Sequence, residues 1–118
     1  MATKIDWYYH RANCETCAKS QAFLTRAEVS IAEQTDARKV RYDRAAALTL
    51  ARGASQVIAA RGKTVLTFDM KKDPPDDDTL ARALLGPHGN LRAPAVKIGG
   101  RLYIGFAEEA WRELAIRR

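Results

Sequence analysis

Residues 4–17 read KIDWYYHRANCETC, and this stretch decides the fold. Apolar and polar residues alternate over residues 4–9, which predicts a first β-strand. The cysteines Cys14 and Cys17 follow it directly, and the apolar residues of 14–28 fall within one arc of a helical wheel. The sequence therefore predicts a strand, a short loop, a Cys-x-x-Cys motif and a helix in direct succession.

The two cysteines are the residues with the clearest chemistry. A thiol attacks as its thiolate, and the free N–H groups and positive dipole of a helix N-terminus favour that form. Cys14 is expected at this end of the helix, with His10 and Arg11 adding positive charge, so we predict Cys14 as the nucleophile and Cys17 as the resolving thiol. Two other interpretations stay open: a pair of inert buried cysteines, and a zinc site completed by His10 and His88.

Composition narrows the class of protein. The 118 residues suit one domain, and 47% hydrophobic with 29% charged residues is globular rather than disordered. No apolar stretch approaches the roughly 20 residues of a membrane span, and the N-terminus lacks a signal peptide's apolar segment, so we expect a cytoplasmic protein that contacts no membrane. A net charge of +6 favours anionic partners. The arginines are scattered without a dense basic block, so we do not expect direct nucleic-acid binding.

The middle of the chain is expected to be largely helical. A weak strand signal covers residues 29–34, and residues 63–70 have extended character without an obvious partner strand, so their state stays open. Capping residues, glycines and the Pro74-Pro75 pair predict three helices, at residues 43–52, 55–61 and 76–85.

The C-terminal third predicts a β-hairpin, with strands at 95–98 and 101–104 joined by Gly99-Gly100, and then a helix from residue 107. The element order βαβ…ββα is that of an α/β thioredoxin-like fold with a mixed four-stranded sheet. We therefore expect a single domain over residues 1–118, with a helical insertion at about 37–90. In this fold Pro94 would be a cis-proline facing the cysteine loop; the alternative is a trans-proline that marks the start of a strand.

Several motifs together resemble the ArsC-type arsenate reductase family of the thioredoxin superfamily, which includes the Spx-type redox-responsive regulators. The motifs are Tyr9-His10-Arg11-Ala12-Asn13-Cys14, Ala60-Arg61-Gly62-Lys63, Arg92-Ala93-Pro94, Gly99-Gly100-Arg101-Leu102 and Gly105-Phe106-Ala107-Glu108-Glu109.

The resemblance implies that Cys14 is the catalytic thiol and that three arginines hold an arsenate oxyanion. Arg61 and Arg101 match two of them, and the planar guanidinium fork suits a tetrahedral oxyanion. The family places the third arginine directly before the proline, where this chain has Ala93 and carries Arg92 one step earlier. One step along an extended segment reverses the direction of a side chain. All three arginines could instead be ordinary surface charge.

These observations lead to three hypotheses for function. The first is a cytoplasmic thiol-disulfide oxidoreductase, without bound cofactor or metal, that draws electrons from thioredoxin, glutaredoxin or glutathione. The second is a true arsenate reductase, in which Cys14 attacks arsenic while Arg61, Arg101 and Arg92 neutralise the oxyanion. The third is an Spx-type redox sensor, whose Cys14–Cys17 disulfide changes the surface presented to RNA polymerase or another protein.

Overall fold

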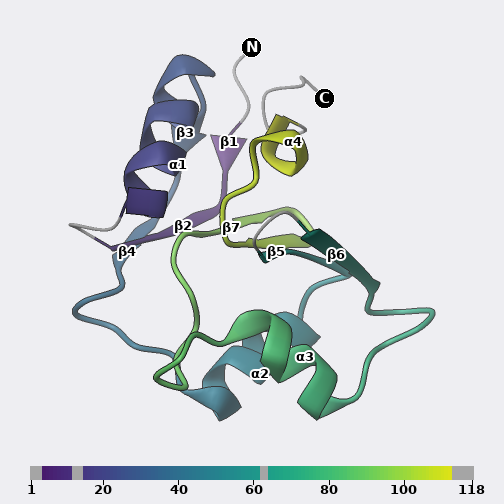
Figure 1. Ribbon diagram of the computed structural model, residues 1–118. Helices are drawn as coiled ribbons and strands as arrows, with labels where there is room; N and C mark the ends of the chain where they lie inside the picture. The colour runs from purple at the N-terminus through teal and green to yellow at the C-terminus, as the bar shows by residue number, and fades with distance from the viewer. Residues whose placement is uncertain (1–3, 12–14, 62–63, 113–118) are drawn as a thin grey trace.

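A mixed β-sheet with helices on both faces forms the protein (Figure 1), and a computed structural model describes residues 4–11, 15–61 and 64–112. Helices α1 (Glu15–Arg26) and α4 (Glu108–Trp111) lie on one face of the sheet, and α2 (Arg44–Arg52) and α3 (Asp77–Leu84) lie on the other. The strands are β1 (Lys4–Ile5), β2 (Trp7–His10), β3 (Ser30–Ile31), β4 (Gln34–Asp36), β5 (Gln56–Arg61), β6 (Thr64–Asp69), β7 (Ala95–Ile98) and β8 (Arg101–Ile104).

The main sheet has the strand order β4-β2-β7-β8-β5-β6 in the described part of the chain. Strand β2 runs parallel to β4 and antiparallel to β7, and β7 forms the expected hairpin with β8. These four strands, with α1 after β2 and α4 after β8, confirm the thioredoxin-like fold class. A short parallel pair, β1 with β3, extends the N-terminal side.

Two further strands, β5 and β6, correct the prediction of a four-stranded sheet with a helical insertion. Residues 55–61, expected as a helix, form β5 instead, which pairs parallel with β8 and antiparallel with β6. Strand β6 covers most of residues 63–70, the segment whose partner was left open. The residues Val57 to Ala60 are buried on both sides of the sheet, so the apolar alternation of a half-exposed strand is missing.

The two helices of the insertion begin and end where their capping residues predict. The Asp43 carboxylate accepts a hydrogen bond from the Ala46 N–H (2.9 Å) at the start of α2, which ends at Gly53. The Asp76 carboxylate accepts a hydrogen bond from the Thr79 N–H (2.7 Å) at the start of α3. This backbone hydrogen bond, together with one from the Thr79 side chain, lowers the pKa of Asp76. Local hydrogen bonding therefore sets both helix starts.

Each face of the sheet has its own apolar core. The core on the α2 and α3 face includes Trp7, Tyr9, Val57, Leu80 and Leu84. The core on the α1 and α4 face includes Ile5, Tyr8, Phe23, Ile58, Tyr103 and Trp111. Successive residues of β2 and β5 alternate between the two cores, which fixes the register of these central strands. Of the helices described, none is long and apolar enough to cross a membrane.

Candidate active site

A cavity of about 1020 Å³ opens where five segments from distant parts of the sequence meet. Its walls come from the end of β2 and the start of α1, from the loop after β4, from the end of β5, from the loop between α3 and β7, and from the residues that follow β8. The lining residues that carry the argument below are Tyr9, Arg11, Thr16, Arg38, Arg41, Ala60, His88, Asn90, Arg92, Gly105 and Phe106.

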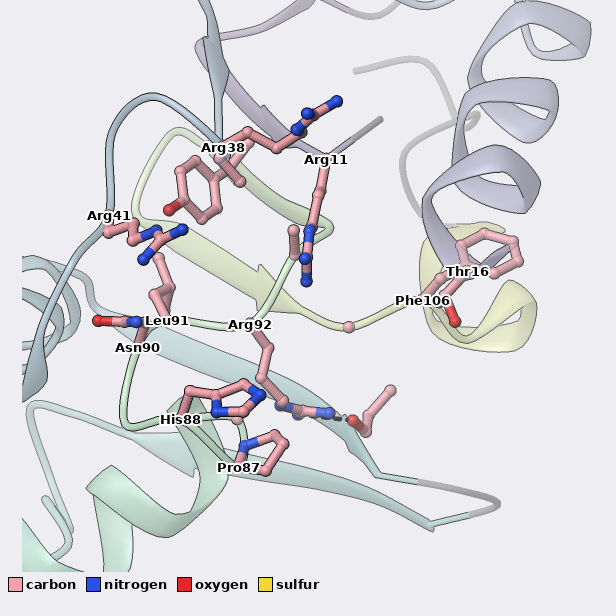
Figure 2. A pocket seen from close by; sticks show the side chains of 16 residues that line it. Arg11, Thr16, Arg38, Arg41, Pro87, His88, Asn90, Leu91, Arg92 and Phe106 are labelled. Carbon is pink, nitrogen blue, oxygen red and sulfur yellow. Dashed lines mark hydrogen bonds between the residues drawn. The ribbon is translucent and has the colours of Figure 1, made fainter. Parts of the chain in front are cut away.

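The lining of this cavity is strongly basic. Arg11, Arg38, Arg41 and Arg92 all contribute, together with His88, and none of the described residues that line it is acidic. In Figure 2, Arg11, Arg41 and Arg92 lie on different sides of the same space. A concave surface lined by charge of one sign concentrates counter-ions, and guanidinium groups form paired hydrogen bonds with carboxylates and oxyanions. The cavity therefore has the chemistry of an anion site.

Arg92 is held in place by backbone carbonyls of two other segments. Its Nη2 donates hydrogen bonds to the carbonyls of Ala60 (2.7 Å) and Ala83 (3.0 Å), which ties β5, α3 and the loop before β7 together. Its Nε is buried without a hydrogen-bond partner. Burial, and to a lesser degree the nearby charge of Arg61, lowers the pKa of Arg92, but an arginine side chain stays protonated in proteins. Arg92 thus lines the cavity although Ala93, not an arginine, precedes the proline.

Neither Arg61 nor Arg101 is among the described residues that line the cavity. Their expected meeting with the Cys14 thiol stays a prediction, because Cys14 lies outside the described residues. The Arg61 guanidinium donates to the carbonyl of Arg82 in the last turn of α3. Arg101 pairs with Ile98 beside the hairpin turn, and its guanidinium lies over the Tyr103 ring at 5.8 Å from the centroid. Arg101 lies away from the cavity because it is the first residue of β8. The other end of that strand, at Ile104 and the following Gly105, is the end that approaches Pro94.

Cys17 lies in the first turns of α1, fully buried. Its Sγ accepts a hydrogen bond from the backbone N–H of Arg11 (3.4 Å), so the residue before the cysteine loop contacts the second thiol directly. Ser20 donates to the Cys17 carbonyl (2.7 Å). Cys14 lies outside the described residues, and its roles as nucleophile and disulfide partner stay predictions. Among the residues described, no group of three His, Cys, Asp or Glu side chains could hold a metal ion.

Pro94 has the predicted backbone geometry, since the Ala93–Pro94 peptide bond is cis. In the antiparallel pairing of β2 with β7, Tyr9 lies opposite Ala95, and the next position in this register sets Pro94 beside His10. The proline therefore neighbours the end of β2, from which the chain leads to Arg11 and the cysteine motif. Its carbonyl accepts a hydrogen bond from the Gly105 N–H (2.8 Å), which joins it to the segment after β8.

Arg38 and Arg41 are the cavity residues that reasoning from the sequence missed. They lie in the basic run ARKVR at residues 37–41, directly after β4. Because β4 runs parallel to β2, its end lies at the same edge of the sheet as the loop that leads to the cysteines. That run of basic residues after the second strand was the available signal. His88, considered above only as a zinc ligand in one of the open alternatives, also lines the cavity.

The fold, with its helix after the first central strand and a cis-proline beside that strand's end, defines a protein of the thioredoxin-like class. Within that class the chain belongs to the ArsC family, whose profile matches residues 9–114. The chain is also similar to a solved structure titled YffB (PA3664) protein, with a TM-score of 0.55 and 18% identity over 93% of this chain and 98% of that one. That likeness supports the fold. No curated protein matches the chain significantly.

Proposed function

We propose that the protein is a cytoplasmic thiol-dependent reductase that acts with Cys14 on an anionic substrate held in the arginine cavity. The observation that supports this most is the set of four arginines around one cavity, in whose lining the described part of the chain places no acidic residue. Arg11 and Thr16, which flank the cysteine loop in the sequence, both line that cavity. Solubilising charge does not account for basic side chains that converge from separate loops on one concave surface.

The same charge would activate the thiol. Cations near a cysteine stabilise its thiolate and lower its pKa, and the N-terminus of α1 acts in the same direction. Cys17 is buried, which suits a resolving thiol that reacts only after Cys14 has been modified. The Arg11 N–H that contacts the Cys17 Sγ would stabilise the negative charge when Cys17 loses its proton.

The reaction with a disulfide then takes two steps. The Cys14 thiolate attacks one sulfur of the substrate, which forms a mixed disulfide and releases the other half as a thiolate. The Cys17 thiolate next attacks the Cys14 sulfur, so that a Cys14–Cys17 disulfide forms and the second half leaves as a thiolate. The two electrons gained by the substrate come from the two cysteines, and thioredoxin, glutaredoxin or glutathione would return them.

Arsenate is the second candidate substrate, and the position of Arg92 in the cavity favours it. Cys14 would attack As(V) and displace one oxygen as water after protonation. Attack of Cys17 on the Cys14 sulfur would then form the disulfide and leave the electron pair on arsenic, which departs as arsenite. Arg92, together with Arg11, would balance the charge of the oxyanion. In this scheme the protein keeps a dithiol-to-disulfide cycle with either substrate.

Steady-state assays with arsenate and with glutathione disulfide, each coupled to a thioredoxin or glutaredoxin system, test the proposal. We expect Cys14→Ser to abolish turnover, and Cys17→Ser to stop it after one mixed disulfide that mass spectrometry detects. Arg41→Gln should raise KM for an anionic substrate, whereas Arg101→Gln, the same charge change outside the cavity, should not. Full activity of Cys14→Ser, or equal effects of the two arginine variants, would contradict the proposal.

A further inference from the structure

Strand β6 is an exposed edge of the main sheet. It is the last strand in the sheet order, and residues 64–67 are all exposed. Val65 and Leu66 are each 39% exposed, and within the described ranges the only other exposed large hydrophobic residue is Val40, in a loop. Figure 1 shows β6 at the outer end of the sheet, away from the N-terminal strands. An apolar edge strand of this kind is a template for pairing with another strand.

Most of the usual protections of an edge strand are missing from β6. Its six residues pair with β5 in an unbroken register without a bulge, they include neither lysine nor proline, and their one charge is at the end, on Asp69. The opposite edge of the sheet is different, because β4 has only three residues. Proteins keep edge strands apart with charges, prolines, bulges or short length, so the lack of all four over residues 64–68 favours a role of this edge in pairing.

The hydrogen-bond pattern shows which backbone groups of β6 face outward. Just beyond the strand, the Met70 N–H donates to the Ser55 carbonyl of the β5 side. In an antiparallel ladder the backbone groups of successive residues point alternately toward the partner strand and away from it. Leu66 is four residues before Met70, so its N–H and C=O point toward β5. The backbone groups of Val65 and Thr67 point away from the sheet and are available to a further strand.

We propose that β6 pairs antiparallel with β6 of a second copy of this chain, about a two-fold axis at Leu66. A two-fold axis perpendicular to the sheet keeps each face of one copy continuous with the same face of the other. Residues with odd numbers therefore meet residues with odd numbers. In this register Val65 lies opposite Thr67 of the second copy, and the two residues form a hydrogen-bonded pair. By the two-fold symmetry, Thr67 forms the same pair with Val65 of the second copy.

The side chains fit this arrangement. Leu66 meets Leu66 of the second copy at the pair without backbone hydrogen bonds, where side chains approach most closely. Val65 meets a β-branched threonine, a favourable cross-strand pair. Residues 64–68 carry no charge, and Asp69, the one charged residue of β6, lies outside the paired segment. Two chains of net charge +6 can therefore meet here without like charges directly opposite each other.

Sedimentation velocity over a range of protein concentrations tests this dimer. We expect the wild type to dimerise as concentration rises, and Leu66→Lys and Leu66→Glu each to stay monomeric with unchanged circular dichroism. Because Leu66 faces itself across the axis, an equimolar mixture of the two variants should form a heterodimer. Val40→Lys, which places the same charge on an exposed apolar residue of a loop, is the control and should dimerise like the wild type.

Hydrogen exchange gives an independent measure of the register. The amides of Val65 and Thr67 should gain protection as the dimer forms, while the Leu66 amide is protected in monomer and dimer alike. A wild type that is monomeric at every concentration overturns the proposal, as does a Leu66→Lys variant that still dimerises or a Lys/Glu mixture that stays monomeric. Reductase activity does not enter these measurements, so the dimer and the proposed function stand or fall separately.

Discussion

Gly105 offers a sharp test of how the cavity wall is built, because the backbone there is fixed from three directions. Its φ is +74°, in the region that favours glycine. Its N–H donates to the Pro94 carbonyl (2.8 Å), and its own carbonyl accepts from the Trp111 indole N–H (3.0 Å). A Cβ at this position would lie 2.8 Å from the Ala60 carbonyl oxygen and 3.4 Å from Nη1 of Arg92.

The expected cost of Gly105→Ala has two parts. The left-handed backbone conformation costs a residue with a Cβ about 1–2 kcal/mol. The contact with the Ala60 carbonyl adds about 1–3 kcal/mol, the range for overpacking, because a backbone oxygen in a central strand cannot move aside. The free energy of unfolding should therefore fall by about 2–5 kcal/mol. For a domain of this size that corresponds to a decrease in Tm of roughly 8–20 °C.

Gly99→Ala is the matched control. Gly99 also has a positive φ, +57°, but a Cβ there would meet no atom within 4 Å. It should cost only the conformational part, about 1–2 kcal/mol. Thermal unfolding followed by circular dichroism, with urea unfolding for the free energies, measures the difference between the two variants. If Gly105→Ala is no more destabilising than Gly99→Ala, the close approach of Gly105 to β5 is not a constraint and this reasoning fails.

Three further predictions concern the supports of the site. Leu80→Ala, in the fully buried face of α3, should lower the free energy of unfolding by about 2–5 kcal/mol in urea titrations, and a loss below about 1 kcal/mol would contradict its place in the core. Trp111→Phe leaves the Gly105 carbonyl without its indole donor, so a loss of about 1–3 kcal/mol is expected by the same method, and no loss would show that the hydrogen bond is dispensable. Asp76→Asn keeps a capping side chain but removes its charge. Hydrogen bonds from Thr79 lower the pKa of Asp76. The wild type should therefore be more stable than Asp76→Asn above the ordinary aspartate pKa, and it should lose this advantage as the pH falls through the lowered pKa. A stability difference between these two proteins that does not change with pH would contradict the charge effect.

The sequence by itself determined the elements whose signals are local. Asp43 and Asp76 cap their helices through their own side chains, and Gly99-Gly100 sets the hairpin turn, so each choice is made by neighbours in the chain. The position of Pro94 just before that hairpin was enough to predict its cis peptide bond. The order of these elements was in turn enough for the thioredoxin-like class.

Only the tertiary structure decided the central strand β5 and the membership of the basic cavity. Val57 to Ala60 form a short apolar run that suits a helix or a buried strand equally, and pairing with β8 and β6 selects the strand. Which arginines face the cavity depends on the end of the strand at which each one lies. Arg101 begins β8 and is directed elsewhere, whereas Arg41 follows β4 and lines the cavity. Motif spacing carries no information on that choice, because contacts between segments so distant in the sequence arise only when the sheet closes around them.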